Sequence, residues 1–477
     1  MPFQDLREFI TRLEAEGEIQ RIDEEVDWNL EMGAMVRRAA EEGLPAPFFQ
    51  RITGYPKGYR VLGGSVASFR RLAVAMDMAA DSHPRELVAE YLHRRQRPIK
   101  PVLVKDGPCK ENIHIGDEVD LLEFPVPLVH DGDGGRYIGT WHLSVSKDVG
   151  SDWVNWGTYR HMVHDEKTLG ILLANPTRHL WTMYTQGYGT QNRPMEVAIA
   201  IGSEPVSTLC AAIPLPRGIS EVDIAGGIRC EPVPLIECET VGLTVPATSE
   251  IVIEGEIVPG ESREEGPFGE FTGYVGGERG PRPIIRVKAI THRNSPILVM
   301  SNPGIPLTDT HVVMSIAKAA EIGEALKAQG LPIGDVAVFP ESSGLLTVVA
   351  VKTLYRGLAK DVAQAIWGIP LGHTQVYVII VEDDVDPFNM GQVLHALVTK
   401  CHPAKGIVTL KKEAVLSFLP WLSNSEKKSG LGGKVYFDCT WPQDWDPMDI
   451  PRKSSFTSIY PQDIQGKALA KWRKYGY

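Results

Sequence analysis

Apolar residues at the start of the chain recur at helical spacing, which predicts an amphipathic helix that ends at Gly17. Residues 18–22 then alternate between apolar and polar side chains, as a strand does. Helical patterns return in three stretches, at residues 30–42, 70–78 and 84–94. We therefore predict an N-terminal α/β segment over residues 1–120. The proline-rich passage at 124–128 should form an extended connector.

The pattern changes towards strands between about residues 136 and 300. β-branched residues are frequent in three stretches punctuated by glycine and proline, at residues 197–201, 250–257 and 284–290. Such strands pair most readily with their neighbours in an antiparallel barrel or sandwich. We therefore predict a β domain over residues 121–310.

One long helix is expected next, over residues 311–329. Beyond it, buried strands alternate with helices, at residues 345–351, 355–367, 376–381 and 389–400. This alternation indicates a second α/β domain over residues 330–477, and places the chain in the α+β class. The closing segment carries Trp441, Trp445 and Trp472, and we expect it to pack against a partner subunit.

Composition excludes several classes of protein. The 477 residues are 43% hydrophobic and 23% charged, with a net charge of −11 and no basic block, which argues against a nucleic-acid partner. No apolar run reaches the roughly 18 residues that cross a membrane, and the acidic, amphipathic start is unlike a secretion signal. The six cysteines contain no C-x-x-C pair. We therefore expect a cytoplasmic protein without disulfides and without a membrane partner.

Residues 261–277 combine acids, glycines and aromatic rings. The acids are Glu261, Glu264, Glu265 and Glu270, and the glycines are Gly266, Gly269, Gly273, Gly276 and Gly277. Glycine lets the backbone approach a ligand closely. Phe268 and Phe271 place apolar surface near Glu265 and Glu270, and a carboxyl group held against aromatic rings resists ionisation. The stretch is either a site with a proton donor active near neutral pH or an acidic loop with packed phenylalanines.

Three familiar site motifs have weak support. No G-x-G-x-x-G follows a strand. Residues 429–435 lack the spacing of a P-loop, so we expect a plain glycine loop there. His161 and His164 have the i,i+3 spacing of a metal pair on a helix, but no H-E-x-x-H frame surrounds them. We therefore expect two hydrogen-bonded surface histidines, and a metal-dependent hydrolase is a weak alternative.

Three further segments mix aromatic rings with polar groups, at residues 153–160, 176–181 and 214–221. In the first, three aromatic rings flank Asn155 and Arg160, which offer an oxygen ligand and a clamp for a carboxylate. The second places a cation and an imidazole beside an indole, and the third ends a rigid proline loop in a carboxylate. Each segment alone also fits a strand end or loop that carries no chemistry.

Taken in order, these motifs resemble the UbiD family of prenylated-FMN-dependent decarboxylases. The motifs are Asn-Trp-x-x-x-Arg (155–160), His-x-Trp (179–181), Pro-x-Pro-x-Gly-x-x-Glu (214–221), Pro-Ala-Thr-Ser-Glu-Ile-Val (246–252) and Glu-Gly-Pro-Phe-Gly-Glu (265–270). The resemblance covers nearly the whole chain. It implies an N-terminal α/β lead, a split β-barrel that binds the cofactor, a linker helix and a C-terminal α/β oligomerisation domain.

The resemblance also implies a set of cofactor and metal contacts. Mn²⁺ would be held by Asn155, His179 and Glu221, and K⁺ mostly by backbone oxygens at Trp156, Cys210, Ala211 and Ile213, with Glu221. Prenylated FMN would contact Asn155, Trp156, Gly157, Thr158, Tyr159, Arg160, Arg178, His179 and Glu221. A lysine that touches the cofactor in some members falls at Pro370 here, which leaves one contact unassigned.

The family's catalytic trio matches Arg160, Glu265 and Glu270. The resemblance implies reversible, non-oxidative loss of CO₂ from an aromatic acid through a covalent adduct with prenylated FMN. Arg160, oriented by Glu265, would position the carboxylate, and Glu270 would supply the proton that replaces CO₂. It further implies a flavin prenyltransferase as the supplier of the cofactor, and a homodimer or homohexamer.

The residues that match the family's substrate pocket are Ile213, Thr310, Met314, His373, Thr374, Leu416 and Phe418. His373, with Asp309 and His311 on either side of Thr310, adds polar groups to this lining. A heteroatom or hydroxyl on the substrate would satisfy them, which favours a (hetero)aromatic acid. A cinnamic-type acid is the alternative, and a flavin-binding protein without catalysis is a further one.

Overall fold

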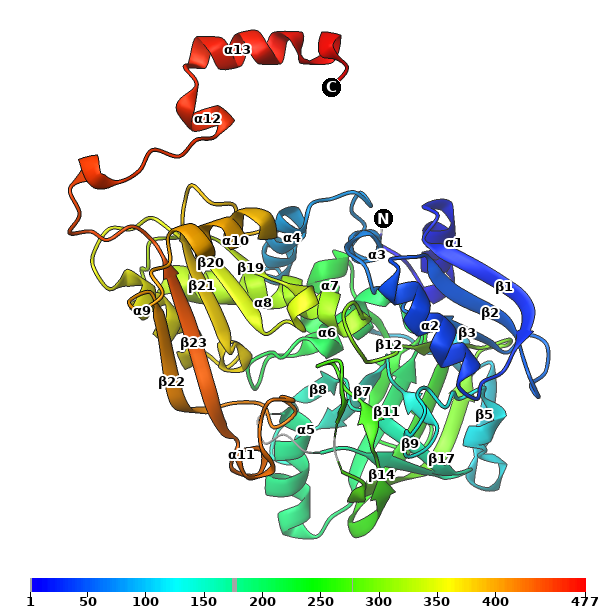
Figure 1. Ribbon diagram of the computed structural model, residues 1–477. Coiled ribbons are helices and arrows are strands. Elements are labelled where there is room, and N and C mark those ends of the chain that lie inside the picture. The colour runs from blue at the N-terminus through cyan, green and yellow to red at the C-terminus, as the bar shows by residue number, and fades with distance from the viewer. Residues whose placement is uncertain (1, 174–177, 277) are drawn as a thin grey trace.

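The first part of the chain forms a small sheet with helices around it (Figure 1). The computed structural model describes residues 2–173, 178–276 and 278–477, so Pro176, Thr177 and Gly277 of the motifs above lie outside the described residues. The strand order is β1 (Ile19–Val26), β2 (Ala46–Ile52), β3 (Arg60–Gly63) and β18 (Ile297–Met300). The helices are α1 (Leu6–Ala15), α2 (Glu31–Glu41), α3 (Phe69–Ala75) and α4 (Pro84–Arg95), which confirms the four predicted helices.

The central part is one long antiparallel sheet that curls on itself (Figure 1). Its path is β6 (Tyr137–Gly139), β9 (His161–Asp165), β10 (Thr168–Ile171), β17 (Gly280–His292), β14 (Ile251–Glu265), β11 (Met195–Ile201), β7 (Leu143–Lys147) and β8 (Val154–Gly157), and β5 (Asn112–Ile115) also pairs with β17. The sheet is a half-barrel with β6 and β8 at its two ends. The predicted antiparallel β region is therefore confirmed.

Two short helices and a small sheet complete the central part. They are α6 (Pro205–Ala212), α7 (Glu221–Arg229), and β4 (Val102–Leu103), β12 (Pro234–Glu237) and β13 (Thr244–Pro246). Every residue of α6 is buried. This leaves the carboxyl end of α6 and the amino end of α7 inside the protein, where their backbone groups can act on a ligand.

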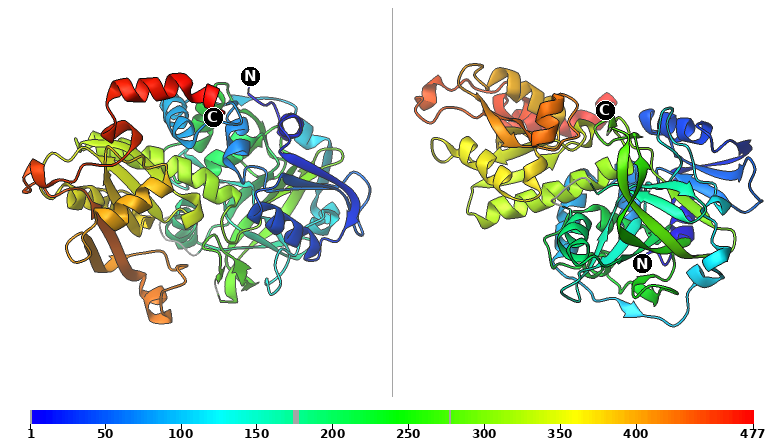
Figure 2. Two further views of the ribbon diagram at one scale, coloured as in Figure 1. Left: turned by 45° about the horizontal axis from the view of Figure 1, so that its top comes forward. Right: turned by 90° about the horizontal axis from the view of Figure 1, so that it is seen from below.

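The helix predicted over residues 311–329 is α8 (Asp309–Ala328). Its apolar residues lie all round the helix rather than in one stripe, which is typical of a helix covered on several sides. It packs against α4 and α6 on one side and against β19 (Ile333–Val338) on another. Both views in Figure 2 show it between the central part and the C-terminal sheet.

The C-terminal sheet has the order β19, β20 (Leu346–Val351), β21 (Tyr377–Glu382), β23 (Leu431–Cys439) and β22 (Ile407–Ala414). Strands β20, β21 and β23 run parallel to one another. Separate apolar clusters cover its two faces, one with α9 (Leu358–Gly368) and the other with α10 (Met390–Thr399). The predicted alternation of strands and helices is confirmed.

Two local predictions are wrong. Residues 431–435 are not a glycine loop but the start of β23, paired with β21 and β22. Glycine is needed at position 432 because a Cβ there would lie within 3.1 Å of Val415, Leu422 and Trp421.

The second wrong prediction concerns the histidine pair. His161 and His164 lie on strand β9 rather than on a helix, and His161 is fully buried. Its Nε2 lies 3.0 Å from Ser144 Oγ, while its Nδ1 has no hydrogen-bond partner among the described residues. Burial lowers the pKa of His161 well below its ordinary value. The pair is therefore neither a surface pair nor the helical metal pair.

The closing segment leaves the C-terminal sheet and runs into α12 (Phe456–Ile459) and α13 (Gln462–Lys471) (Figure 1). Its apolar residues are exposed, among them Trp445, Met448, Leu469 and Trp472. The predicted packing against a partner subunit stays a prediction. Among the described residues, no helix is both long and apolar enough to cross a membrane.

Candidate active site

The motif at residues 265–270 closes the end of strand β14. Glu265 is the last residue of that strand and is fully buried. The chain then turns into a short hairpin, in which β15 (Phe268–Gly269) pairs with β16 (Val275–Gly276). A Cβ on Gly276 would lie 2.4 Å from Cγ of Glu270. This glycine therefore makes room for the Glu270 side chain, whereas the sequence suggested room for a ligand.

Arg160, Glu265 and Glu270 meet in one cluster. Arg160 donates from Nε and Nη2 to the two oxygens of Glu265, both at 2.9 Å. Its Nη1 donates to Oε1 of Glu270 at 2.6 Å. The Arg160 side chain is 10% exposed, and Glu270 is 15% exposed. Such two-pronged pairing fixes the plane of the guanidinium group as well as its position.

Tyr137 belongs to this cluster, although sequence reasoning missed it. Its hydroxyl donates to Oε1 of Glu265 at 2.8 Å, and its ring packs 4.0 Å from that of Phe268. Phe268 lies in turn under the guanidinium of Arg160, 5.7 Å from the ring centre. Tyr137 is 128 residues from Glu265 in sequence, and it carries no motif that would have singled it out.

The acidity of Glu270 is clearly perturbed. Burial raises its pKa to about 7, even though Arg160 acts in the opposite direction. Glu265 contributes to the rise because two carboxylates in one site disfavour a second negative charge. The carboxyl group of Glu270 can therefore hold or release a proton near neutral pH.

A second group of polar side chains lies on and beside β8. Oδ1 of Asn155 is 2.9 Å from Nδ1 of His179, the first residue of α5 (His179–Thr182). One residue along, the backbone N–H of Trp156 donates to Oε2 of Glu221 at 2.9 Å. Asn155 is buried, and its Nδ2 has no hydrogen-bond partner among the described residues. Unpaired buried polar atoms of this kind are typical of a site that a ligand completes.

Glu221 has the properties expected of a residue that binds a cation. It is the first residue of α7, is almost wholly buried, and burial raises its pKa to about 8. A bound cation would favour its ionised form. The residues matched to the K⁺ site include Cys210 and Ala211, in the last turn of α6, and Ile213 just beyond it. The carboxyl end of a helix favours a positive charge, so these backbone oxygens also fit a cation.

Residues 157–159 of the predicted cofactor segment connect the polar group at Asn155 with the cluster at Arg160. Gly157 ends β8, and a Cβ there would lie 2.5 Å from the ring of Tyr159. The hydroxyl of Tyr159 accepts a hydrogen bond from the backbone N–H of Leu180 at 3.2 Å. Thr158 is half-buried beside them, and Arg178 directly precedes α5. One six-residue stretch therefore carries Asn155 at one end and Arg160 at the other.

Pro370 is exposed, but a lysine elsewhere lies inside the protein. Lys318 on α8 is buried, and its Nζ donates to the carbonyl of Gly344 at 2.9 Å. Burial, with a smaller effect of Arg178, lowers its pKa to about 7. Sequence reasoning missed Lys318, because the apolar pattern around it indicates only a buried helix.

The predicted pocket residues come from three elements. Thr310 and Met314 are one turn apart on α8, His373 and Thr374 lie on η7 (Gly372–Thr374), and Leu416 and Phe418 follow β22. Leu416 packs against an apolar cluster with Val376 and Val415. All but Ile213 are partly exposed.

Two polar groups expected in that lining are engaged elsewhere. Both ring nitrogens of His311 have partners, the hydroxyl of Thr308 at 2.9 Å and the carbonyl of Phe271 at 2.5 Å. Burial lowers the pKa of His311 to about 4. Asp309 is buried and accepts from the backbone N–H of Val66 at 2.8 Å. His373 is partly exposed, while Oδ2 of Asp309 is buried without a hydrogen-bond partner among the described residues.

Comparison with known proteins identifies the class. Three family domains of 3-octaprenyl-4-hydroxybenzoate carboxy-lyase match the chain: the N-terminal domain at residues 10–91, the Rift-related domain at 100–306 and the C-terminal domain at 311–439. A carboxy-lyase removes a carboxyl group as CO₂, so the chain has the architecture of a decarboxylase.

Individual relatives agree with this class. The chain is 32% identical to the pyrrole-2-carboxylic acid decarboxylase of Pseudomonas aeruginosa, over 99% of this chain and 98% of that protein. It is also 32% identical to ferulic acid decarboxylase 1 of Saccharomyces cerevisiae, over 100% of this chain and 99% of that protein. The chain belongs to the UbiD family, and it is a decarboxylase.

Solved structures confirm the fold. The vanillic acid decarboxylase of Sedimentibacter hydroxybenzoicus in its closed form is 30% identical, with a TM-score of 0.88 over 100% of this chain and 99% of that chain. An evolved dimeric form of HmfF from Pelotomaculum thermopropionicum, in complex with prFMN, is 29% identical, with a TM-score of 0.80 over 94% of this chain and 97% of that chain. The UbiD-like fold expected from the motifs is therefore confirmed.

Proposed function

We propose that the protein is a prenylated-FMN-dependent decarboxylase of a (hetero)aromatic carboxylic acid, and that Arg160, Glu265 and Glu270 carry the reaction. The observation that supports this most strongly is the position of Arg160. Its guanidinium is shared between a fully buried glutamate and a second glutamate whose pKa is about 7. One cluster thus offers a cation for a carboxylate and a proton for the carbon that loses it.

The residues of the β8 segment would hold the cofactor and its metals. Asn155, His179 and Glu221 supply oxygen and imidazole ligands that suit Mn²⁺, and the unpaired Nδ2 of Asn155 fits a further acceptor in the site. Backbone oxygens at the end of α6 would hold K⁺. When bound, prenylated FMN would supply the electron sink that amino-acid side chains lack. A flavin prenyltransferase would have to provide it.

The protonation state of Glu270 links binding to proton transfer. When Glu270 is neutral, its attraction for Nη1 of Arg160 weakens, and that N–H becomes available to the substrate carboxylate. Glu265, held by Tyr137, keeps the other side of the guanidinium in place. After CO₂ leaves, Glu270 delivers its proton to the carbon. The reverse sequence, with Glu270 ionised, would carboxylate the product under high CO₂.

The preference for a ring acid rests mainly on His373, since both ring nitrogens of His311 are engaged and Asp309 is buried. A partly buried imidazole without a substrate partner would be unfavourable beside a purely apolar ligand. A heteroatom or hydroxyl on the ring would bond to it. The alternative is a cinnamic-type acid, because one relative is named a ferulic acid decarboxylase.

The division into domains follows the same proposal. Residues 121–310 would bind the cofactor, residues 311–329 would link the domains, and residues 330–477 would form the oligomer, behind the N-terminal segment 1–120. The exposed apolar residues of the closing segment support burial against another copy. We propose a homodimer or a higher oligomer such as a homohexamer.

The test is to co-express the protein with a flavin prenyltransferase, record its visible spectrum and manganese content, and assay a panel of acids for CO₂ release. We expect a coloured protein that releases CO₂ from ring acids such as pyrrole-2-carboxylate or a hydroxybenzoate. A coloured protein that turns over cinnamates and no ring acid would refute the substrate class. A coloured protein that turns over none of the acids would favour a flavin-binding protein without catalysis, and a colourless one would refute the proposal altogether.

A further inference from the structure

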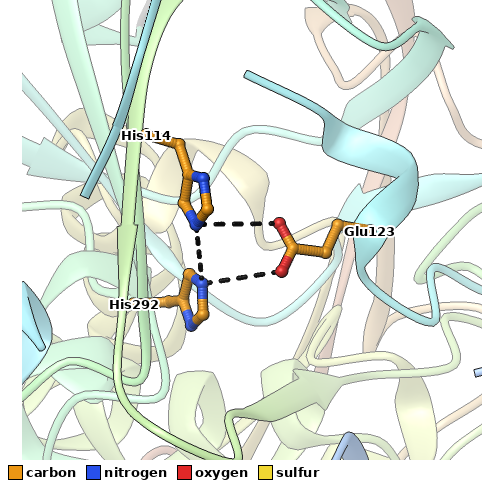
Figure 3. A group of neighbouring side chains, drawn as sticks. All are labelled: His114, Glu123 and His292. Atoms are coloured by element: carbon orange, nitrogen blue, oxygen red, sulfur yellow. Dashed lines mark hydrogen bonds and ion pairs between the residues drawn. The ribbon is translucent and has the colours of Figure 1, made fainter. Parts of the chain in front are cut away.

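Two histidines and a glutamate meet far from the cluster described above, at the other end of the strand pair β14–β17. His292 is the last residue of β17, and His114 on β5 is paired with Ile290, two residues earlier. The two imidazoles therefore lie diagonally on one face of the sheet. Glu123 reaches them from η3 (Leu121–Glu123) on the opposite side (Figure 3).

The two imidazoles lie within hydrogen-bond distance of each other, and the carboxylate of Glu123 lies just beyond that distance from both. Nε2 of His114 lies 3.3 Å from Nε2 of His292. The carboxylate oxygens of Glu123 lie 3.9 Å from the first nitrogen and 3.7 Å from the second, too far for hydrogen bonds. Ligands at about 2.0–2.2 Å in a tetrahedral zinc site are roughly 3.4 Å apart. The two distances involve different oxygens, Oε2 towards His114 and Oε1 towards His292, so Glu123 must move to bring one oxygen within ligand spacing of both imidazoles.

Neighbouring groups orient the ligand atoms. Nδ1 of His292 lies 2.8 Å from the carbonyl oxygen of Arg293, which can only accept, so Nδ1 carries the proton. In the neutral ring, Nε2 then presents its lone pair towards His114 and Glu123. On the other side, the hydroxyl of Tyr59 donates to Oε1 of Glu123. Two of the three groups thus have an outer partner of the kind that is typical of metal sites.

The burial and packing of these side chains are those of a structural metal site. The side chain of His292 is 6% exposed, and the ring of Phe124 packs edge-on 5.4 Å from it. The side chains of His114 and Glu123 are 30% and 29% exposed, so water can reach the remaining coordination positions. Tyr59 precedes β3 of the N-terminal sheet. A metal here would tie η3 to the central sheet, and the hydrogen bond from Tyr59 to Glu123 would link the N-terminal sheet to the same point.

We propose that His114, Glu123 and His292 bind a divalent transition metal of the Zn²⁺ class. Two imidazoles and a carboxylate are a ligand set that zinc accepts in proteins, with water at the open position. No residue of this set belongs to the sites proposed for Mn²⁺, K⁺ or the flavin. The proposal therefore stands independently of the proposed function.

The test uses Zn²⁺ alone on the full-length protein, with H114Q compared against wild type. His114 is chosen because it is partly exposed, whereas replacing the buried His292 risks misfolding. The matched control is H93Q, an exposed histidine whose Nδ1 lies 3.7 Å from Glu90 but which has no second histidine beside it. Zn²⁺ affinity is measured by competition with a chromophoric chelator, and thermal stability with and without Zn²⁺.

Wild type and H93Q should bind one Zn²⁺ at least tenfold more tightly than H114Q, and Zn²⁺ should raise the melting temperature of these two proteins more than that of H114Q. Any Zn²⁺ taken up at Asn155, His179 and Glu221 is common to all three proteins and cancels in the comparison. Y59F keeps all three ligands but should bind Zn²⁺ about 10–100-fold more weakly, as loss of an outer-shell partner does. Equal affinity in wild type and H114Q, or no rise in melting temperature in wild type, would overturn the proposal.

Discussion

Two polar clusters share the segment from Asn155 to Arg160, and they differ in how their buried atoms are satisfied. At the Arg160 end, both oxygens of Glu265 and one of Glu270 already accept from the guanidinium. At the Asn155 end, Nδ2 of Asn155 has no partner among the described residues, and burial raises the pKa of Glu221 to about 8. The polar atoms of the first cluster pair with one another, while the second leaves a buried donor unpaired.

This difference separates two tasks within one site. Groups that already satisfy each other hold their positions before the substrate arrives, which is what catalysis by orientation and charge requires. Groups left unpaired gain most from an incoming ion or cofactor, because binding removes a desolvation penalty. Changes at the Arg160 end should therefore impair turnover and stability while the flavin and manganese stay bound.

The largest effect is expected from R160M. It leaves Glu265 and Glu270 buried without their cation, and breaking a buried pair in this way costs about 3–5 kcal/mol of folding stability. Turnover should fall below detection. Chemical denaturation and a CO₂ assay measure the two effects. The control is R263M, since Arg263 pairs with Asp165 at the surface, where a pair contributes about 0–1 kcal/mol. Equal losses in both variants would show that the buried cluster has no special role.

E265Q comes next. The amide keeps the shape but loses the charge that holds two N–H groups of Arg160, so the guanidinium can move. A misplacement of about 1 Å can reduce a rate roughly 10²-fold. We expect that loss in kcat, with the flavin content unchanged. E264Q, an exposed neighbour on the same strand, should behave as wild type. Full activity in E265Q would show that Glu265 does not position Arg160.

Y137F tests the support behind Glu265. It removes one hydrogen bond to a charged oxygen, an interaction of about 1.5–3 kcal/mol, and should slow turnover about tenfold. Y274F removes an exposed hydroxyl from the turn between β15 and β16 and serves as the control. Should Y137F lower the affinity for the flavin rather than the rate, Tyr137 would belong to the cofactor site instead.

The smallest effect concerns pH. The pKa of Glu270 is raised to about 7, so the carboxyl group is protonated below that pH and loses its proton above it. If it is the proton donor, kcat/KM should be highest below pH 7, halve at pH 7 and fall about tenfold by one pH unit higher. The same rise in pKa stabilises the fold at low pH, and this contribution is lost as the pH rises through 7. A rate that increases through pH 7 would contradict the assignment.

Much of the fold could be predicted because the local patterns are strong. The helical spacing up to Gly17 and the long apolar stretch of α8 correspond to helices in the structure. Pairing between distant strands could not be predicted. β18 comes from the end of the central part yet completes the N-terminal sheet beside β3, and no local pattern specifies that partner.

The active site, like the fold, could be predicted only where a local sequence pattern marks its residues. The carboxylates of the 265–270 motif stand out because of their glycine and phenylalanine neighbours, whereas Tyr137 has no such setting. The spacing of His161 and His164 suggested a helix, but the segment pairs as strand β9 and buries the first of them. His114 and His292 are 178 residues apart, so only the β5–β17 pairing brings them together.

The central claim is that Glu270 supplies the proton that replaces CO₂, in a site whose cofactor is held by other residues. The most direct test compares wild type and E270Q, each loaded with prenylated FMN and Mn²⁺, by following CO₂ release from a ring acid in D₂O. Wild type should release CO₂ and place one deuterium on the carbon that carried the carboxyl group. E270Q should keep its flavin and manganese and release at least about 10²-fold less. Full CO₂ release by E270Q, with deuterium placed as in wild type, would contradict the account.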